Sequence, residues 1–97
     1  MAEHVLKTWP EYFHAIRFGS KTFELRKNDR NFSVGDVLVL HCWDPNDGSF
    51  SGYPPIRRVV SYSMIGGQFG LERGWICMGL RHEFHCDTDP KLKGPFW

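Results

Sequence analysis

The sequence predicts a small α+β domain in which a mixed sheet of five or six strands packs against one or two short helices. Three observations predict this class. Short apolar runs with strand-like alternation recur along the chain, separated by turn-forming residues. Apolar residues at helical spacing occur in one stretch near the N-terminus. The length of 97 residues suits a single hydrophobic core.

The N-terminal part of the chain is expected to form a short strand followed by a helix. Val5 and Leu6 mark the strand, and Thr8 with Glu11 three residues later is a helix-start signature in which Thr8 acts as the N-cap. The residues that then recur at helical spacing are Trp9, Tyr12, Phe13 and Ile16. Gly19 supplies the stop, which gives a helix of about ten residues.

The next predicted strand, Lys21 to Lys27, carries unusually many charges. Alternation puts Phe23 and Leu25 on one face and Glu24 and Arg26 on the other. Two interpretations follow. The charged face is either exposed to solvent with a weak ion pair, since exposed pairs contribute little, or it forms a ligand site.

The remaining strands are expected at Val37 to Cys42, Ile56 to Ile65 and Trp75 to Leu80. A tight turn at Gly35 and Asp36 precedes the first of these, which predicts a hairpin with the strand before it. The segment 44–48 has turn formers without the ligand spacing of a calcium hand, and 49–55 continues the loop. No periodicity follows His82, so residues 1–82 form the predicted domain and 83–97 an irregular tail.

Charge and composition restrict the kind of partner. The formal charge is only +1 and aromatic residues make up 15% of the chain, so affinity for nucleic acid must come from a local patch. This excludes a histone-like or tail-type binder. The basic residues that crowd the first third are Lys7, Arg17, Lys21, Arg26, Lys27 and Arg30.

Cysteine usage and hydropathy suggest a cytoplasmic protein. The cysteines are three, an odd number, and a polar N-terminus precedes the first apolar run, so no signal peptide is expected. No apolar segment approaches the roughly 20 residues that a membrane-spanning helix requires. We therefore expect no membrane association.

The order G-x-K-x-x-E-x-R from Gly19 to Arg26, followed by V-G-D-x-L-x-L from Val34 to Leu40, resembles the ASCH family over about Lys7 to Leu80. The flanking segments 4–13 and 66–71 are similar to those of short ASCH-like domains of phages and bacteria with no assigned function. The resemblance implies a small PUA-like mixed β-barrel associated with RNA.

The same resemblance implies a polar cleft between barrel and helix, at Lys21, Glu24 and Arg26. The family includes amidohydrolases that deacylate modified cytidine and others that look like ribonucleases, and Lys21 matches the amidohydrolase lysine. This chain departs from that pattern, because Glu24 stands where those enzymes have a threonine and the helical insertion bearing their distal glutamate is missing. The candidates for catalysis are Lys21, Glu24 and Tyr12.

Two further groups are candidates for ligand binding. One is His4, Lys7, Thr8 and Trp9, where a helix N-terminus favours an anion, although capping alone explains Thr8, and Trp9 suits the core as well as a stacking role. The other is the glycine-rich loop 66–70, where Gln68 and Phe69 could contact a base or belong to a simple connection. With Lys21, Glu24, Arg26 and Lys27, these residues make up the predicted binding set.

The spacing of the possible metal ligands does not favour a metal site. Four possible zinc ligands, Cys77, His82, His85 and Cys86, occur near the end of the chain. They lack both the H-E-x-x-H spacing and paired C-x-x-C motifs, so we expect no metal and no other cofactor. Cys42 and Cys77 lie within apolar strands and are expected to be inert packing residues.

The sequence thus leaves three function classes open. We favour an RNA-binding module with a basic cleft, whose ligand is RNA or a nucleotide-like small molecule. The alternative is a hydrolase, either a metal-independent ribonuclease or an amidohydrolase acting on a modified nucleoside. A protein-interaction module that uses the same cleft is the third, and in each case we expect a monomer.

Overall fold

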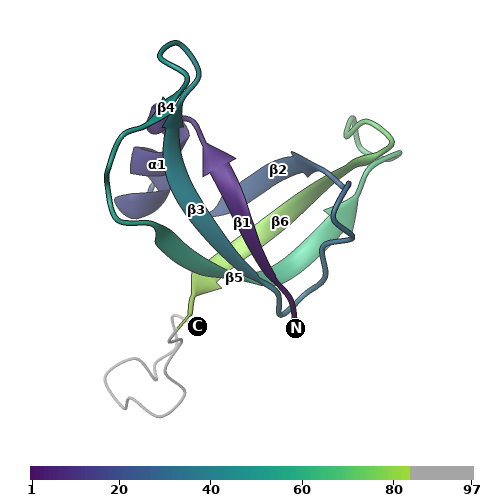
Figure 1. Ribbon diagram of the computed structural model, residues 1–97. Helices are drawn as coiled ribbons and strands as arrows, with labels where there is room; N and C mark the ends of the chain where they lie inside the picture. The colour runs from purple at the N-terminus through teal and green to yellow at the C-terminus, as the bar shows by residue number, and fades with distance from the viewer. Residues whose placement is uncertain (84–97) are drawn as a thin grey trace, which may run out of the picture.

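The computed structural model describes residues 1–83, which form one mixed sheet with a short helix beside it (Figure 1). The elements are β1 (Glu3–Thr8), α1 (Pro10–Arg17), β2 (Phe23–Lys27), β3 (Val37–Asp44), β4 (Ser49–Phe50), β5 (Ile56–Ile65) and β6 (Trp75–His82). The predicted α+β class is confirmed, with six strands and one helix. Within the described residues, no helix is long and apolar enough to span a membrane.

The strands follow the order β1-β3-β5-β6-β2, with β4 paired to the end of β3. β1 and β3 are parallel, and the other pairs are antiparallel. Parallel neighbours need a long crossover, which here contains α1 and β2. The predicted hairpin between the segments of β2 and β3 is therefore wrong, because β2 pairs with β6 and β3 pairs with β1 and β5.

The turn before β3 explains why it does not pair with β2. Gly35 has a φ of 94°, which permits the tight turn, and the Asp36 carboxylate accepts hydrogen bonds from the backbone N–H groups of Ser33 and Ala2. These bonds tie the turn to the start of β1. The chain consequently enters the sheet beside β1, away from β2.

The sheet is not closed into the barrel that was expected. β1 and β2 are its two edge strands, and no backbone ladder joins them. Arginine side chains from β2 and from the loop after it bond to carbonyl groups of β1 instead. An open edge with unpaired carbonyl groups needs such partners, because edge strands otherwise expose a row of free polar groups.

Helix α1 packs on the sheet through Phe13 and Ile16, which are buried in the core with residues such as Leu38 and Met78. Gly19, with a φ of 86°, lies just beyond the helix and allows the predicted stop. The N-terminus differs from the prediction. Trp9 occupies the N-cap position and no side chain caps the helix, since Thr8 is still part of β1.

Strand β2 buries a charged residue and exposes apolar ones, the reverse of the usual arrangement. Glu24 is buried, with 4% of its surface exposed, whereas Phe23 and Leu25 are 43% and 47% exposed. The alternation was predicted correctly, but the charged face points inward and the apolar face outward. Burying the charge of Glu24 costs free energy, so opposite charges and hydrogen-bond donors around it must offset that cost.

The predicted strands after the turn are confirmed with small shifts in their ends. β5 has the predicted bounds, while β3 and β6 each extend two residues further. The short strand β4 occupies part of the segment 49–55 that was expected to be loop. The predicted tail from residue 83 lies almost wholly outside the described residues.

Candidate functional site

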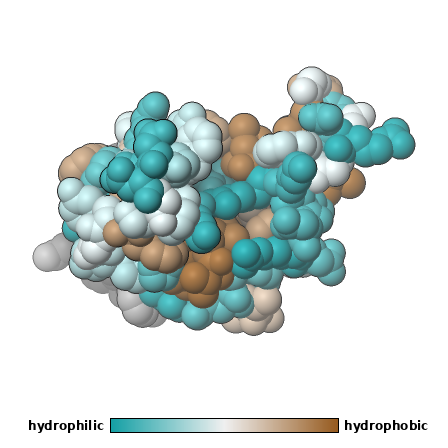
Figure 2. Space-filling model, turned by 45° about the horizontal axis from the view of Figure 1, so that its top comes forward, coloured by the Kyte–Doolittle hydropathy of each residue, from teal (hydrophilic) through white to brown (hydrophobic). Residues whose placement is uncertain are grey.

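A cleft of about 720 Å³ opens between the end of β1, the start of α1 and strand β2. Its lining contains five basic side chains, Lys7, Lys21, Arg26, Lys27 and Arg30, and two acidic ones, Glu24 and Asp29. Aromatic and aliphatic side chains complete the walls. Figure 2 shows this mixture on the molecular surface, where brown hydrophobic areas lie in a hollowed region bordered by teal hydrophilic ones. A protein with a net charge of only +1 thus concentrates positive charge in one cleft.

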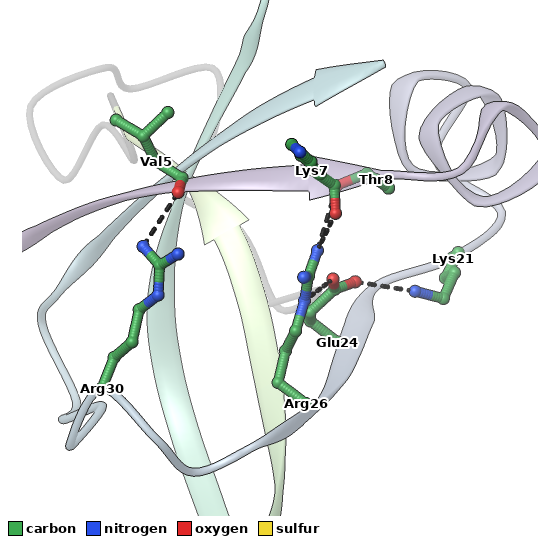
Figure 3. Close-up of polar contacts among 7 residues, drawn as sticks. All are labelled: Val5, Lys7, Thr8, Lys21, Glu24, Arg26 and Arg30. Carbon is green, nitrogen blue, oxygen red and sulfur yellow. Dashed lines mark hydrogen bonds and ion pairs between the residues drawn. The ribbon is translucent and has the colours of Figure 1, made fainter. Parts of the chain in front are cut away.

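Glu24 is the centre of the polar network in the cleft (Figure 3). Lys21 Nζ lies 2.9 Å from its Oε1, and Arg26 Nε lies 2.7 Å from its Oε2. The side chains of Lys21 and Arg26 are 17% and 24% exposed, so both cations are mostly shielded from solvent. One carboxylate therefore holds two cations that border the cleft.

Arginines bridge β2 and the following loop to the open edge of β1. Arg26 Nη2 donates to the carbonyl oxygen of Lys7 at 2.7 Å and to the Thr8 hydroxyl at 3.2 Å. Arg30 Nη1 donates to the carbonyl oxygen of Val5 at 2.9 Å. Within the described residues, these bonds and the ion pair with Glu24 use Nε and Nη2 of Arg26. The N–H groups of Nη1 are left to contact a ligand.

Aromatic rings form the wall nearest the helix. Trp9 and Tyr12 are stacked with 6.2 Å between ring centroids, and both are substantially exposed. Lys21 Nζ lies 5.3 Å from the centroid of Tyr12 and 5.1 Å from that of Phe23. Trp9 is therefore a surface residue of the cleft and not a core residue. Such a platform next to cations suits a planar ligand with a negative group.

The structure brings together seven of the predicted ligand residues and separates three. The seven in the cleft are Lys7, Thr8, Trp9, Lys21, Glu24, Arg26 and Lys27, and the catalytic candidate Tyr12 joins them. Gln68 and Phe69 lie in the loop between β5 and β6, outside the cleft, where Gln68 bonds to the carbonyl oxygen of Ile65. The anion site expected at the N-terminus of the helix lacks its Thr8 cap, because Thr8 belongs to β1, and the Thr8 hydroxyl accepts a bond from Arg26 instead.

His4, the third separated residue, serves the turn before β3. Its Nε2 lies 2.9 Å from Asp36 Oδ2, and its ring packs edge-on against Phe32 with 4.7 Å between centroids. Burial raises the pKa of Asp36, but hydrogen bonds from Ala2, His4 and Ser33 outweigh burial and hold this pKa below its ordinary value of 3.8. His4 therefore stabilises the fold and does not contact the cleft.

The low pKa of Asp36 implies that the stability of the folded protein depends on pH in the acid range. Because the folded state holds the pKa below 3.8, Asp36 stabilises the protein above that pH, and this stabilisation is lost as pH falls through the folded value. We expect Asp36→Asn to lower the free energy of unfolding at pH 7, and its difference from wild type to shrink below pH 3.8. Urea unfolding of both proteins across pH measures this. A difference that stays constant would contradict it.

Arg30 and Trp75 line the cleft but were not in the predicted binding set. Arg30 was already named among the basic residues that crowd the first third of the chain. Trp75 comes from the far end of the chain, where it pairs with Lys27 in the register of β2 and β6. Only knowledge of that pairing could have placed it beside the cleft.

The possible zinc ligands lie partly within the described residues. No group of three or more His, Cys, Asp or Glu side chains within residues 1–83 is arranged to hold a metal ion. Of the four possible zinc ligands, His85 and Cys86 lie outside the described residues. Cys42 is buried, Cys77 is half-buried, and both are free thiols.

Comparison with known proteins yields a family and a phage relative. A family model described as a domain of unknown function, DUF3850, matches residues 3–80. An uncharacterized 12.9 kDa protein in the GpA 3′ region of Escherichia phage P2 is 43% identical over 57 residues, which are 59% of this chain and 50% of that protein. The match thus spans about half the length of this curated relative. The family match includes every residue that lines the cleft.

Proposed function

This chain belongs to the DUF3850 family, and we propose that it is a module that binds single-stranded RNA in the cleft between β1, α1 and β2. The observation that carries the proposal is the pairing of five basic side chains with the exposed rings of Trp9 and Tyr12 in one cleft. Cations contact phosphates, and exposed rings stack on bases that are not already stacked in a duplex.

The proposal includes a finer assignment of the fold, to a PUA-like domain of the ASCH family. Two features support it. The motif from Gly19 to Arg26 runs through the segment before β2 into β2, its Lys21, Glu24 and Arg26 line the cleft, and the helix follows the first strand beside that cleft. The open edge between β1 and β2 departs from a closed barrel, but arginine side chains bridge it.

Single strands suit the cleft better than duplexes. The rings of Trp9 and Tyr12 share the cleft with Arg26 and lie beside Lys21, so a base stacked on these rings has a phosphate partner nearby. In a duplex the base faces are covered by stacking and cannot reach the rings of Trp9 and Tyr12. The cleft also contains two acidic residues, which would repel the phosphates of a duplex, where two strands bring many negative charges close together.

A hydrolase is the second candidate, because Lys21 and Glu24 are in contact and lie beside Tyr12. Both oxygens of Glu24, however, accept hydrogen bonds from cations. These bonds use one acceptor site on each oxygen, and the Glu24 side chain is only 5% exposed, so little room is left for a water molecule that would give up its proton to Glu24. This arrangement suits a carboxylate that positions cations for binding better than one that acts as a general base.

Lys21→Ala tests the binding site. We expect wild type to bind a short mixed-sequence single-stranded RNA in a salt-sensitive manner, and the variant to bind about tenfold more weakly, since one charge-assisted contact is lost. The slope of log affinity against log salt should become shallower by about one unit or slightly less. Fluorescence anisotropy across a salt series measures both quantities.

Lys21→Arg is the matched control, because it keeps the charge and a donor towards Glu24. It should retain most of the affinity. The RNA is examined for cleavage after each titration, and cleavage by wild type that Lys21→Ala abolishes would establish the hydrolase in place of the binding module. Unchanged affinity in Lys21→Ala would remove Lys21 from the site.

A further inference from the structure

A second hollow lies next to the cleft, on the other side of the arginine bridge, by which we mean the bonds of Arg26 and Arg30 to the carbonyl groups of β1. It measures about 410 Å³ and is lined by Val5, Leu6, Lys7, Arg26, Arg30, His41 and Phe50. Four of these residues, Leu6, Lys7, Arg26 and Arg30, also line the cleft. The two hollows therefore share one wall, which the arginine bridge and the edge of β1 form together.

The shared wall presents guanidinium groups along the edge of a strand. Arg26 and Arg30 bond to the carbonyl groups of Lys7 and Val5, which are two residues apart in β1 (Figure 3). Residues i and i+2 of a strand are separated by about 6.6 Å, so the guanidinium groups are spaced along a line and do not converge on one point. A row of this kind suits an extended polyanion.

The second hollow has its own exposed aromatic ring, Phe50, beside a cation, Lys7, that also lines the cleft. Phe50 is 56% exposed and packs edge-on against Trp43, with 4.9 Å between ring centroids. Lys7 Nζ stands 3.9 Å from the centroid of Trp43 and 6.0 Å from that of Phe50. The combination of an exposed ring and an ammonium group repeats that of Tyr12 and Lys21 in the cleft.

We propose that the two hollows form one track for a single strand of at least two nucleotides. One base stacks on Trp9 and Tyr12 in the cleft, successive phosphates of the strand contact Arg26 and Arg30, and the next base stacks on Phe50 in the second hollow. This inference rests on the proposed function and adds the length of the ligand and a second base site. Arginine forks suit the central position because their N–H donors match phosphate oxygens.

If this track exists, affinity should rise with the length of the oligonucleotide, and Phe50→Ala should remove most of that rise. Wild type should bind uridine oligonucleotides of two or more residues at least about fivefold more tightly than uridine monophosphate, because a second base stacks. Phe50→Ala should lose most of this gain and leave binding of the monophosphate unchanged. Isothermal titration calorimetry with oligonucleotides of one to six residues measures both.

Two control variants make the result specific. Phe50→Tyr keeps a stacking ring and should retain the gain with length. Tyr62→Ala removes an aromatic side chain that is 73% exposed on β5 and lies outside both hollows, and it should behave as wild type. Thermal unfolding checks that each variant is folded, which we expect because Phe50 and Tyr62 are surface residues.

The outcomes separate this inference from the proposed function. If wild type binds RNA but Phe50→Ala shows the same dependence on length, the second base site is wrong and the cleft alone binds the ligand. Equal weakening of the monophosphate and the longer oligonucleotides by Phe50→Ala would also overturn the track. If wild type binds none of the probes, both the proposed function and the track fail.

Discussion

Replacing Glu24 by alanine is expected to destabilise the protein by about 2–3 kcal/mol, although Glu24 contributes nothing to the apolar core. Its carboxylate is buried and is held by Lys21 at 2.9 Å and Arg26 at 2.7 Å. Removing one partner of a buried ion pair leaves the other charge uncompensated, which typically costs about 3–5 kcal/mol. The lower value expected here follows from the partial exposure of both cations, which water can solvate after the change.

Urea unfolding of Glu24→Ala against wild type measures this effect. Glu72→Ala is the matched control, because Glu72 is an exposed glutamate in the loop between β5 and β6, and it should change stability by less than about 0.5 kcal/mol. Glu24→Gln keeps the size of the side chain and removes the charge, so it should resemble Glu24→Ala. A Glu24→Ala protein as stable as wild type would mean that the network does not hold the cleft together.

Strand β2 shows how far alternation in a sequence can be interpreted. A period of two separates Phe23 and Leu25 from Glu24 and Arg26, and this separation was predicted. The period does not say which face points inward. The usual preference for apolar residues inside does not hold here, because Lys21 and Arg26 compensate the charge of the buried Glu24.

Strand pairing was harder to predict than strand position. β5 was placed correctly to the residue, yet the partner of β2 turned out to be β6, roughly fifty residues further along the chain. The bond between His4 and Asp36, which joins β1 to the turn before β3, spans 32 residues. Local patterns carry no signal of such contacts, which depend on the register of the whole sheet.

The candidate site was predicted in part for the same reason. Most of the cleft comes from the segment that runs from β1 to the loop after β2, so Lys7, Trp9 and Lys21 could be grouped before their positions were known. Gln68 and Phe69 were grouped with them on residue type, but their loop lies at the turn between β5 and β6. Phe50, in the second hollow, sits in a strand of two residues that no periodicity could indicate.

Reversing the charge of Arg30 is expected to weaken binding of single-stranded RNA about 100-fold at low salt. Arg30 lies in the wall shared by both hollows and bonds to the carbonyl oxygen of Val5. Arg30→Glu removes a phosphate contact and places a repelling charge at the same point. The fold should tolerate the change, because the lost hydrogen bond is exposed and worth only about 0.5–1.5 kcal/mol.

The most direct test of RNA binding in this cleft compares Arg30→Glu with Arg81→Glu across a salt series. Arg81 is exposed on β6 and lines neither hollow, so both variants have the same net charge and differ only in where the charge changes. We predict that Arg30→Glu loses binding at low salt, that Arg81→Glu binds within about threefold of wild type, and that the gap narrows as salt screens the charges. Equal losses of affinity in the two variants would show that RNA binding depends only on the net charge of the protein, and would contradict a binding site in the cleft.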